Sequence, residues 1–367
     1  MRLLICAGGT GGGVYPALAV LQSLGNEEVT VLWVGGEGGM EAELVKRQGV
    51  PYTAIPAAGV HGVGLRSLPG NIAKLVRGVA ASRRILRQFK PDVLLFTGGY
   101  VAAPMAVAGR SIPSLLYTPD IEPGMALKFL ARYASIVAVT APDSRAFFPG
   151  RKHLEVSGYP TRPELTRYDR DEARRSLNLN LDQPVVLVTG GSKGARSINR
   201  AVTANLNDLL KMAQVLHLTG NLDWPEIQAF QAGLSPELAG RYHAYSYLHD
   251  MGSALASADI VVSRAGASTL GEYPLFGLPA VLVPYPYAWR YQKVNAAYLV
   301  DKGAAKMIKD EDLPKQLVPV LSELLDDVEN LNAMRAAMRS LARPEASQRL
   351  AALVRDLAGA NPQEGNA

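Results

Sequence analysis

Several features that define other classes of protein are scarce or missing in this sequence. The 367 residues include one cysteine, Cys6, so no internal disulfide can form, as is usual in a reducing compartment. Cys6 stands within an apolar run, where we expect a small buried side chain rather than a reactive thiol. The chain opens with no secretory leader, and no apolar run reaches the roughly 18 residues of a membrane span. A disulfide-stapled or membrane-spanning protein is therefore not expected.

A strong net charge is also lacking. The formal charge is only +5, which is too weak overall to indicate nucleic acid as a partner. Hydrophobic residues make up 48% of the chain, enough for sizeable cores, and the length predicts two domains. The composition is that of a folded globular protein.

Short apolar runs alternate with helical stretches along the whole chain. "RLLICAGG", "VTVLWVGG", "PVVLVTGG" and "ADIVVSRAG" are examples, each a continuous apolar run that ends in glycine or a glycine turn. Such runs are typical of parallel strands that helices cover on both faces. The sequence therefore predicts an α/β protein.

One pattern occurs twice. "LLICAGGTGGG" and "VVLVTGGSKGA" are both a strand followed by a glycine turn and a helix, far enough apart for one doubly wound domain between them. We predict two facing Rossmann-like domains over residues 1–160 and 161–342, with a cleft at their connection. A final helix over 343–360 could pack back onto the N-terminal domain.

The two glycine turns predict anion sites. Backbone N–H groups of a glycine loop and of the following helix terminus point one way, an arrangement that holds phosphate. Neither the dinucleotide spacing G-x-G-x-x-G nor the nucleotide loop G-x-x-x-x-G-K-[ST] is present at the first turn, so a plain NAD enzyme is disfavoured. The second turn adds Ser192, Lys193 and Arg196, although an ordinary tight turn with solvated cations is the alternative.

A third segment, "ADIVVSRAGASTLGEYPLFGLPAVLVP", combines a strand, a glycine turn and a helix with one acid, Glu272. A carboxylate there can accept hydrogen bonds from both hydroxyls of a ribose. The small residues Ala267, Ser268 and Thr269 would let backbone N–H groups approach a diphosphate. The alternative for Glu272 is simple stabilisation by the helix dipole.

These motifs resemble those of the MurG-type GT-B glycosyltransferases. The resemblance covers nearly the whole chain and rests on "GGTGG-VYPALAV", "GGYVAAP", "GYPTRPE", "GGSKGAR", "YLHDM", "RAGASTLGE", "GLPAVLVPYP" and "Q-VNA", in the family's order. It implies a GT-B fold and an inverting, metal-independent hexosyltransferase without a cofactor. The implied substrates are UDP-N-acetylglucosamine and the lipid-linked muramyl-pentapeptide of peptidoglycan synthesis, used peripherally at the inner face of the cell membrane.

The resemblance also implies the role of single residues. Thr10, Gly11 and Gly12 would line the cleft near the diphosphate, and Arg162, Ser192 and residues 267–269 would hold the donor phosphates. Leu248 would meet the uracil through its backbone, Glu272 would bind the ribose, and Gln292 would contact hexosamine hydroxyls. The pair Asp169 and Asp171 has the spacing of a metal-binding Asp-x-Asp, but a helix N-cap is the expected role.

Two landmark positions depart from the family pattern. Gly13 replaces the family's histidine after "GGTGG", and Tyr117 to Asp120 replace its His-Glu-x-Asn tetrad. Inverting transfer needs a base for the acceptor hydroxyl, and no histidine precedes His61. We predict Asp120 as this base in preference to Glu122. The alternative is that both acids only shape and cap a proline-flanked loop.

Residues 60–90 contain many cations and no acid. A basic amphipathic stretch suits the anionic leaflet of a membrane, where each cation adds about 1 kcal/mol. A solvated helix face is the alternative. The predicted membrane contacts are Arg66, Lys74, Arg77, Arg83 and Arg84.

Other functions remain compatible with the same donor site. They are a transferase with a different lipid acceptor, a UDP-sugar 2-epimerase, and a non-catalytic protein that binds nucleotide sugars.

Overall fold

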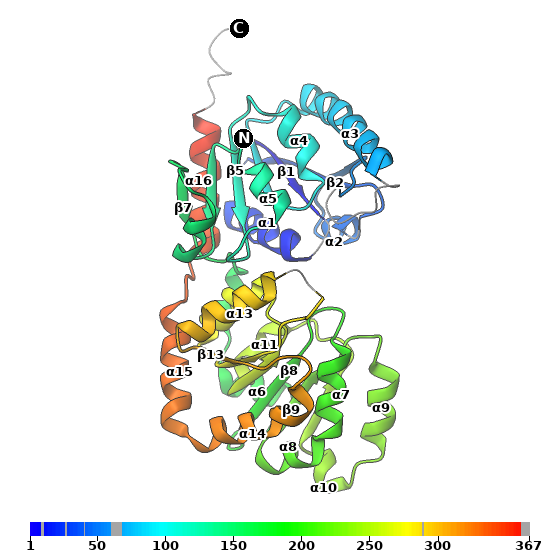
Figure 1. Cartoon of the computed structure of the whole chain (residues 1–367), viewed down its shortest axis with the longest axis vertical. Coiled ribbons are helices and arrows are strands. Elements are labelled where there is room, and N and C mark those ends of the chain that lie inside the picture. The colour runs from blue at the N-terminus through cyan, green and yellow to red at the C-terminus, as the bar shows by residue number, and fades with distance from the viewer. Residues whose placement is uncertain (9–10, 26–27, 40, 60–67, 288–289, 361–367) are drawn as a thin grey trace. The chain divides into compact units, whose positions relative to one another are not determined.

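The computed structural model describes residues 1–8, 11–25, 28–39, 41–59, 68–287 and 290–360. The chain forms two compact units (Figure 1). Unit 1 comprises Met1–Pro163 and Arg343–Ala367, and unit 2 comprises Glu164–Ala342. The chain thus leaves unit 1 three residues after the expected boundary and returns to it with its last helix.

Unit 1 is built on a sheet of seven parallel strands in the order β3-β2-β1-β4-β5-β6-β7. The predicted parallel α/β class is confirmed. Its central strands β1, β4 and β5 are mostly apolar and buried at every position except Arg2, because helices cover both faces of the sheet. The strands are β1 (Arg2–Ala7), β2 (Thr30–Gly36), β3 (Tyr52–Ile55), β4 (Val93–Gly98), β5 (Ser114–Thr118), β6 (Ile136–Val139) and β7 (Leu154–Val156).

Successive residues of β1 point into two different cores of unit 1. Leu3 and Ile5 pack in the core formed with α1, α2 and α16, whereas Leu4 and Cys6 pack in the core formed with α3, α4 and α5. The predicted burial of Cys6 is confirmed, and burial raises the pKa of its thiol. The helices are α1 (Gly11–Leu24), α2 (Glu41–Arg47), α3 (Leu68–Phe89), α4 (Ala102–Ala108), α5 (Met125–Leu130) and α16 (Ala346–Gly359), with a 3-10 turn η1 (Pro142–Phe147).

Helix α16 is the C-terminal segment that completes unit 1. Leu350 and Val354 are fully buried in the same core as Val14 and Val20 of α1, and α16 also contacts β4 and β5 (Figure 1). Without α16, one face of the sheet would expose this apolar surface to water. The last described helix is therefore part of the core of unit 1.

Unit 2 contains six parallel strands in the order β10-β9-β8-β11-β12-β13. One face of this sheet packs against α7, α8 and α14. The strands are β8 (Val185–Thr189), β9 (Gln214–Leu218), β10 (Tyr242–Tyr245), β11 (Ile260–Ser263), β12 (Ala280–Leu282) and β13 (Ala305–Met307). The helices are η2 (Pro163–Arg167), whose first residue lies in unit 1, α6 (Arg170–Ser176), α7 (Arg196–Ala204), α8 (Leu206–Met212), α9 (Trp224–Ala232), α10 (Pro236–Ala239), α11 (Met251–Ser257), η3 (Ala267–Leu270), α12 (Glu272–Phe276), α13 (Tyr291–Asp301), α14 (Leu313–Asp326) and α15 (Val328–Ser340).

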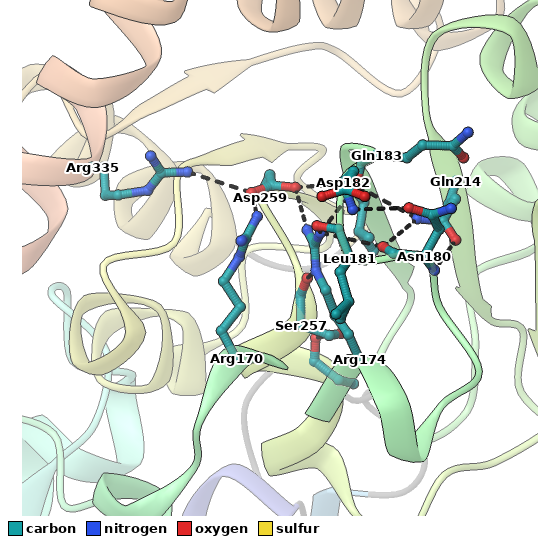
Figure 2. Close-up of polar contacts among 12 residues, drawn as sticks. Arg170, Arg174, Asn180, Leu181, Asp182, Gln183, Gln214, Ser257, Asp259 and Arg335 are labelled. Carbon is teal, nitrogen blue, oxygen red and sulfur yellow. Dashed lines mark hydrogen bonds and ion pairs between the residues drawn. The ribbon is translucent and has the colours of Figure 1, made fainter. Parts of the chain in front are cut away.

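A buried polar network joins four elements of unit 2 (Figure 2). Asp259, just before β11, accepts hydrogen bonds from Arg170 and Arg174 of α6, at 2.7 Å each, and from the N–H of Val185. Arg335 of α15 lies 3.7 Å from the same carboxylate. The network holds the amino ends of β8 and β11 in place, and the carboxyl ends of these strands carry the predicted donor site.

Candidate functional site

The predicted donor residues of unit 2 follow two adjacent strands. Strand β8 lies between β9 and β11, and Thr189 and Ser263 are partners in the register of β8 and β11. The strand order reverses at β8, and in open α/β sheets such a switch point at the carboxyl ends of the strands is where ligands bind. The loops that carry Ser192 and Glu272 therefore begin side by side at one sheet edge.

The loop after β8 is a glycine turn. Gly191 and Gly194 have φ angles of +82° and +75°, and the N–H of Gly194 donates to the carbonyl of Gly191 at 2.9 Å. Ser192 and Lys193 are exposed at the tip of the turn. The chain then enters α7 at Arg196, so the turn leads directly to a helix N-terminus, a favourable place for an anion.

A side chain at Gly194 has no room. Its Cβ would lie 2.0 Å from the carbonyl oxygen of Thr219, which follows β9. The left-handed φ and this close approach both require glycine. The loop after β9 therefore sets the position of the turn that carries Ser192.

Arg196 is engaged elsewhere than at the tip of the turn. Its Nε donates to Asp223 at 2.9 Å, and Asn199 donates to the same carboxylate at 2.8 Å. The amide oxygen of Asn199 accepts a hydrogen bond from Nε2 of His217 at 3.0 Å, and Nδ1 of the same ring lies 2.8 Å from the hydroxyl of Tyr242. The sequence predicts two cations beside Ser192. Lys193 lies exposed at the tip of the glycine turn, whereas Arg196 binds Asp223 in the loop after β9.

His217 is the buried centre of this network. It is fully buried, and desolvation lowers its pKa to about 3. The ring is consequently neutral at physiological pH and acts as a fixed hydrogen-bonding group rather than a titrating one.

Arg264 joins several loops at this edge of the sheet, a role that sequence reasoning missed. It follows β11 and donates to Asp310 at 2.5 Å, to the hydroxyl of Ser197 at 2.7 Å and to the carbonyl of Val283 at 3.0 Å. It thereby joins the start of α7 to the ends of β11 and β12. Its position at the end of a predicted strand, inside "SRAGAS", could have indicated that Arg264 lies at this edge of the sheet.

The turn at residues 267–269 forms the 3-10 helix η3. Thr269 donates to the carbonyl of Gly266 through its N–H at 3.1 Å and through its hydroxyl at 2.7 Å, so it closes the turn. Ala267 and Ser268 occupy the first positions of the 3-10 helix. Glu272, half-buried, begins the next short helix, α12.

Gln292 and Leu248 extend this edge of unit 2. Gln292, in the first turn of α13, accepts a hydrogen bond from the N–H of Tyr285 at 2.8 Å through its carbonyl oxygen. This bond fixes the amide, whose nitrogen supplies two donors. Leu248 lies half-buried in the loop between β10 and α11, next to the T-shaped ring pair of Tyr247 and His249.

The first glycine loop occupies the switch point of unit 1, because β1 lies between β2 and β4. Thr10 falls outside the described residues, and Gly11 and Gly12 begin α1. Gly13 accepts a hydrogen bond from the Thr97 hydroxyl at 2.5 Å, and a Cβ on it would lie 3.3 Å from the Thr97 carbonyl oxygen. Glycine at this position thus lets α1 approach β4 closely.

The predicted bases follow β5. Glu122 is buried, with 7% of its surface exposed, and lies 3.8 Å from the Lys128 ammonium of α5, whereas Asp120 is half-exposed. Tyr117 is fully buried, its hydroxyl is 2.7 Å from that of Thr140, and burial raises its pKa. Tyr117 is therefore a core residue, and Asp120 is the more accessible of the two acids.

Three other predictions fall on described residues. Arg162, half-buried, lies one residue before the end of the first segment of unit 1. The carboxylate of Asp169 accepts hydrogen bonds from the N–H groups of Asp171 and Glu172, which confirms its predicted role as an N-cap. Among the described residues, no group of three or more His, Cys, Asp or Glu side chains could hold a metal ion.

Helix α3 has one buried and one basic face. Gly78, Ser82 and Leu86, spaced four residues apart, are buried. Ile72 and Val76 of the same helix are exposed. The predicted contacts Lys74, Arg77, Arg83 and Arg84 are exposed, and Arg66 lies outside the described residues. Within the described part of the chain, no helix is both long and apolar enough to cross a bilayer.

Comparison with known proteins agrees with this architecture. Residues 3–139 match the glycosyltransferase family 28 N-terminal domain, and residues 185–350 match the C-terminal domain of the same family. The crystal structure of MurG from Acinetobacter baumannii superposes with a TM-score of 0.79 and 30% identity, covering 97% of this chain and 99% of that one. The predicted GT-B fold is confirmed.

Curated relatives are similar over nearly their full length. Two of them bear the name UDP-N-acetylglucosamine–N-acetylmuramyl-(pentapeptide) pyrophosphoryl-undecaprenol N-acetylglucosamine transferase. The protein from Roseiflexus sp. (strain RS-1) is 38% identical over 97% of this chain and 95% of its own length. That from Desulforudis audaxviator is 37% identical over 98% of this chain and 99% of its own length. The chain therefore belongs to glycosyltransferase family 28.

Proposed function

We propose that this protein is an inverting glycosyltransferase that moves N-acetylglucosamine from UDP-N-acetylglucosamine to a lipid-linked muramyl-pentapeptide. One observation carries the donor half of the proposal. Arg264 stands between β11 and the 267–269 turn and donates to Ser197 in the first turn of α7, which follows the Ser192 loop. This bond lies at the switch point of unit 2, where a diphosphate can bind. The names of the relatives support the choice of sugar and acceptor.

In this proposal the donor lies along the carboxyl edge of unit 2. The N–H groups near Ser192, Ala267 and Ser268 bind the diphosphate, Arg162 also contacts the donor phosphates, and Thr269 holds the turn. Leu248 meets the uracil, Glu272 accepts both ribose hydroxyls, and Gln292 donates to the hexosamine. As UDP leaves, it develops negative charge that the N–H groups and the arginine stabilise.

Unit 1 receives the acceptor in this proposal. Asp120 takes the proton of the attacking hydroxyl, because it is more accessible than Glu122, which lies beside Lys128. The resemblance to the family gives Thr10, Gly11 and Gly12 a role near the diphosphate. The basic face of α3 docks on the anionic inner leaflet, where Ile72 and Val76 add apolar contact. The protein then works as a peripheral protein at the cytoplasmic membrane surface.

The test is a product assay with UDP-N-acetylglucosamine and a polyprenyl-diphosphate muramyl-pentapeptide. We expect a disaccharide-lipid product and free UDP from the wild-type protein. Glu272→Ala should weaken UDP binding by calorimetry at least about tenfold, since it removes two hydrogen bonds to the ribose. Glu226→Ala, on the exposed side of α9, is the matched control and should bind UDP normally.

Three results would contradict the proposal. Formation of a sugar epimer from UDP-N-acetylglucosamine without any acceptor would assign a 2-epimerase instead. UDP binding without turnover on any lipid acceptor would indicate a non-catalytic binding protein, and turnover only with another lipid would change the acceptor.

A further inference from the structure

Glu41 is a buried acid close to the first glycine loop. It begins α2, only 1% of its surface is exposed, and its Oε1 accepts a hydrogen bond from the N–H of Gly36 at 2.8 Å. Burial, together with the Glu41 charge, raises the pKa of nearby Tyr52 to about 12. Burying a carboxylate costs free energy unless other groups compensate for the loss of water, so the neighbours of Glu41 matter.

Two glycines make room for this carboxylate. A Cβ on Gly8 would lie 2.4 Å from Oε1 of Glu41, and a Cβ on Gly39 would lie 2.2 Å from it. Neither glycine has a left-handed φ, so backbone conformation does not require glycine at these positions. A Cβ at either position would instead force the buried Glu41 carboxylate to move, because real Cβ atoms do not approach another heavy atom so closely.

Gly8 is held from its other side as well. Gly99, with a φ of +84°, would place a Cβ 2.4 Å from the carbonyl oxygen of Gly8. Gly8, which follows β1, therefore lies between the carboxylate of Glu41 in α2 and the backbone of Gly99, which follows β4. Further along, the hydroxyl of Thr97 holds Gly13.

We propose that Glu41 is a positioning residue for sugar transfer, whose carboxylate sets the position of Gly8, where the chain leaves β1. The inference rests on the proposed function, in which the first glycine loop has a role near the diphosphate. Glu41 is buried and touches the loop rather than the substrate. A shift of the loop by about 1 Å can lower turnover roughly 100-fold, because the reacting groups lose their alignment.

The experiment compares Glu41→Gln with Glu43→Gln. Glutamine keeps the size of Glu41 and one acceptor oxygen but replaces the second oxygen by a donor. We expect kcat to fall at least about tenfold and amide hydrogen exchange in residues 8–24 to become faster, with UDP affinity within about twofold of wild type. Glu43 lies on the same helix, with its side chain 85% exposed beside Arg47, and its variant should match wild type in all three measurements.

A second pair tests the contact itself. Gly8→Ala should reproduce the loss of kcat, since its methyl group displaces the carboxylate, and Glu41→Asp should restore part of the activity lost in Glu41→Gln. In the Glu41→Ala background, Gly8→Ala should have little further effect. If the losses of kcat caused by Gly8→Ala and Glu41→Ala add fully in the double variant, the inference is wrong. It is also wrong if Glu41→Gln has the kcat and the hydrogen exchange of the wild-type protein.

The two proposals can fail separately. If the wild-type protein transfers no sugar, the proposed function fails, and hydrogen exchange in residues 8–24 still decides whether Glu41 positions the loop. If UDP affinity and melting temperature fall together with kcat in Glu41→Gln, Glu41 only supports the fold and the positioning role is wrong.

Discussion

Nη2 of Arg174 and Oδ2 of Asp259 lie 2.7 Å apart in the interior of unit 2. Arg174 is fully buried, and its other N–H groups donate to backbone carbonyls, among them those of Leu181 at 2.6 Å and Ser257 at 3.0 Å (Figure 2). Asp259 also accepts the N–H of Val185 at 2.9 Å. This pair therefore joins α6 to the starts of β8 and β11.

Loss of this pair should destabilise unit 2. Replacing Arg174 by Met leaves a buried carboxylate short of one partner, so we expect the free energy of unfolding to fall by about 3–5 kcal/mol. Urea denaturation followed by tryptophan fluorescence, with Trp224 in unit 2, measures this change. Lys211→Met removes an exposed pair with Asp208 and should change the free energy by less than about 1 kcal/mol. Equal effects of the two variants would contradict the assignment.

Burial of His217 predicts a pH dependence of stability. Its pKa is about 3 in the folded protein, against an ordinary value of 6.5, so between these values the unfolded chain binds a proton that the folded protein does not. Stability is therefore lost as pH falls from about 6.5 towards 3. We expect the melting temperature of His217→Gln to depend less on pH in this window than that of wild type. His249→Gln, an exposed histidine, should keep the wild-type slope.

Two glycines of the turn after β8 allow backbone strain and steric conflict to be tested separately. Both Gly191→Ala and Gly194→Ala place alanine at a positive φ, at a cost of about 1–2 kcal/mol. Only at Gly194 does the new Cβ meet a backbone atom, the Thr219 carbonyl oxygen. We expect Gly194→Ala to weaken UDP binding at least about tenfold more than Gly191→Ala in calorimetry. If both variants bind UDP alike, the close approach to Thr219 does not shape the donor loop.

Asp120→Asn tests the proposed base. Removing a general base lowers kcat by roughly 100- to 10,000-fold, while UDP affinity should stay near that of wild type. Glu122→Gln removes the charge of a buried acid that lies 3.8 Å from the Lys128 ammonium, and it should act mainly on melting temperature. Steady-state assays at saturating donor and acceptor compare the two. A larger loss of kcat in Glu122→Gln would move the base to Glu122.

Charge reversal on α3 tests the membrane contact. Lys74→Glu combined with Arg77→Glu should reduce flotation with anionic vesicles at least about tenfold, because each cation near the surface contributes about 1 kcal/mol. Binding to neutral vesicles should change little. The control, Lys211→Glu, alters an exposed charge of unit 2. Flotation that does not depend on anionic lipid would show that this face is only solvated.

Local patterns in the sequence were enough to predict the α/β class, the repeated strand and glycine-turn pattern, the burial of Cys6 and the N-cap at Asp169. These features depend on a few neighbouring residues, since a continuous apolar run must be covered on both faces and an aspartate before a helix finds its N–H groups. The family followed from the order of the motifs, while the roles of single site residues stay predictions.

Tertiary structure decided which polar groups meet. It placed Tyr117 in the core, engaged Arg196 with Asp223, joined Arg264 to Ser197, and brought Glu41 against Gly8. The two members of each contact come from different elements, some of them far apart in the chain. The spacing of residues along the sequence therefore does not reveal these contacts. Sequence alone sets what each element buries, whereas the contacts between elements depend on how strand order and helix packing bring the loops together.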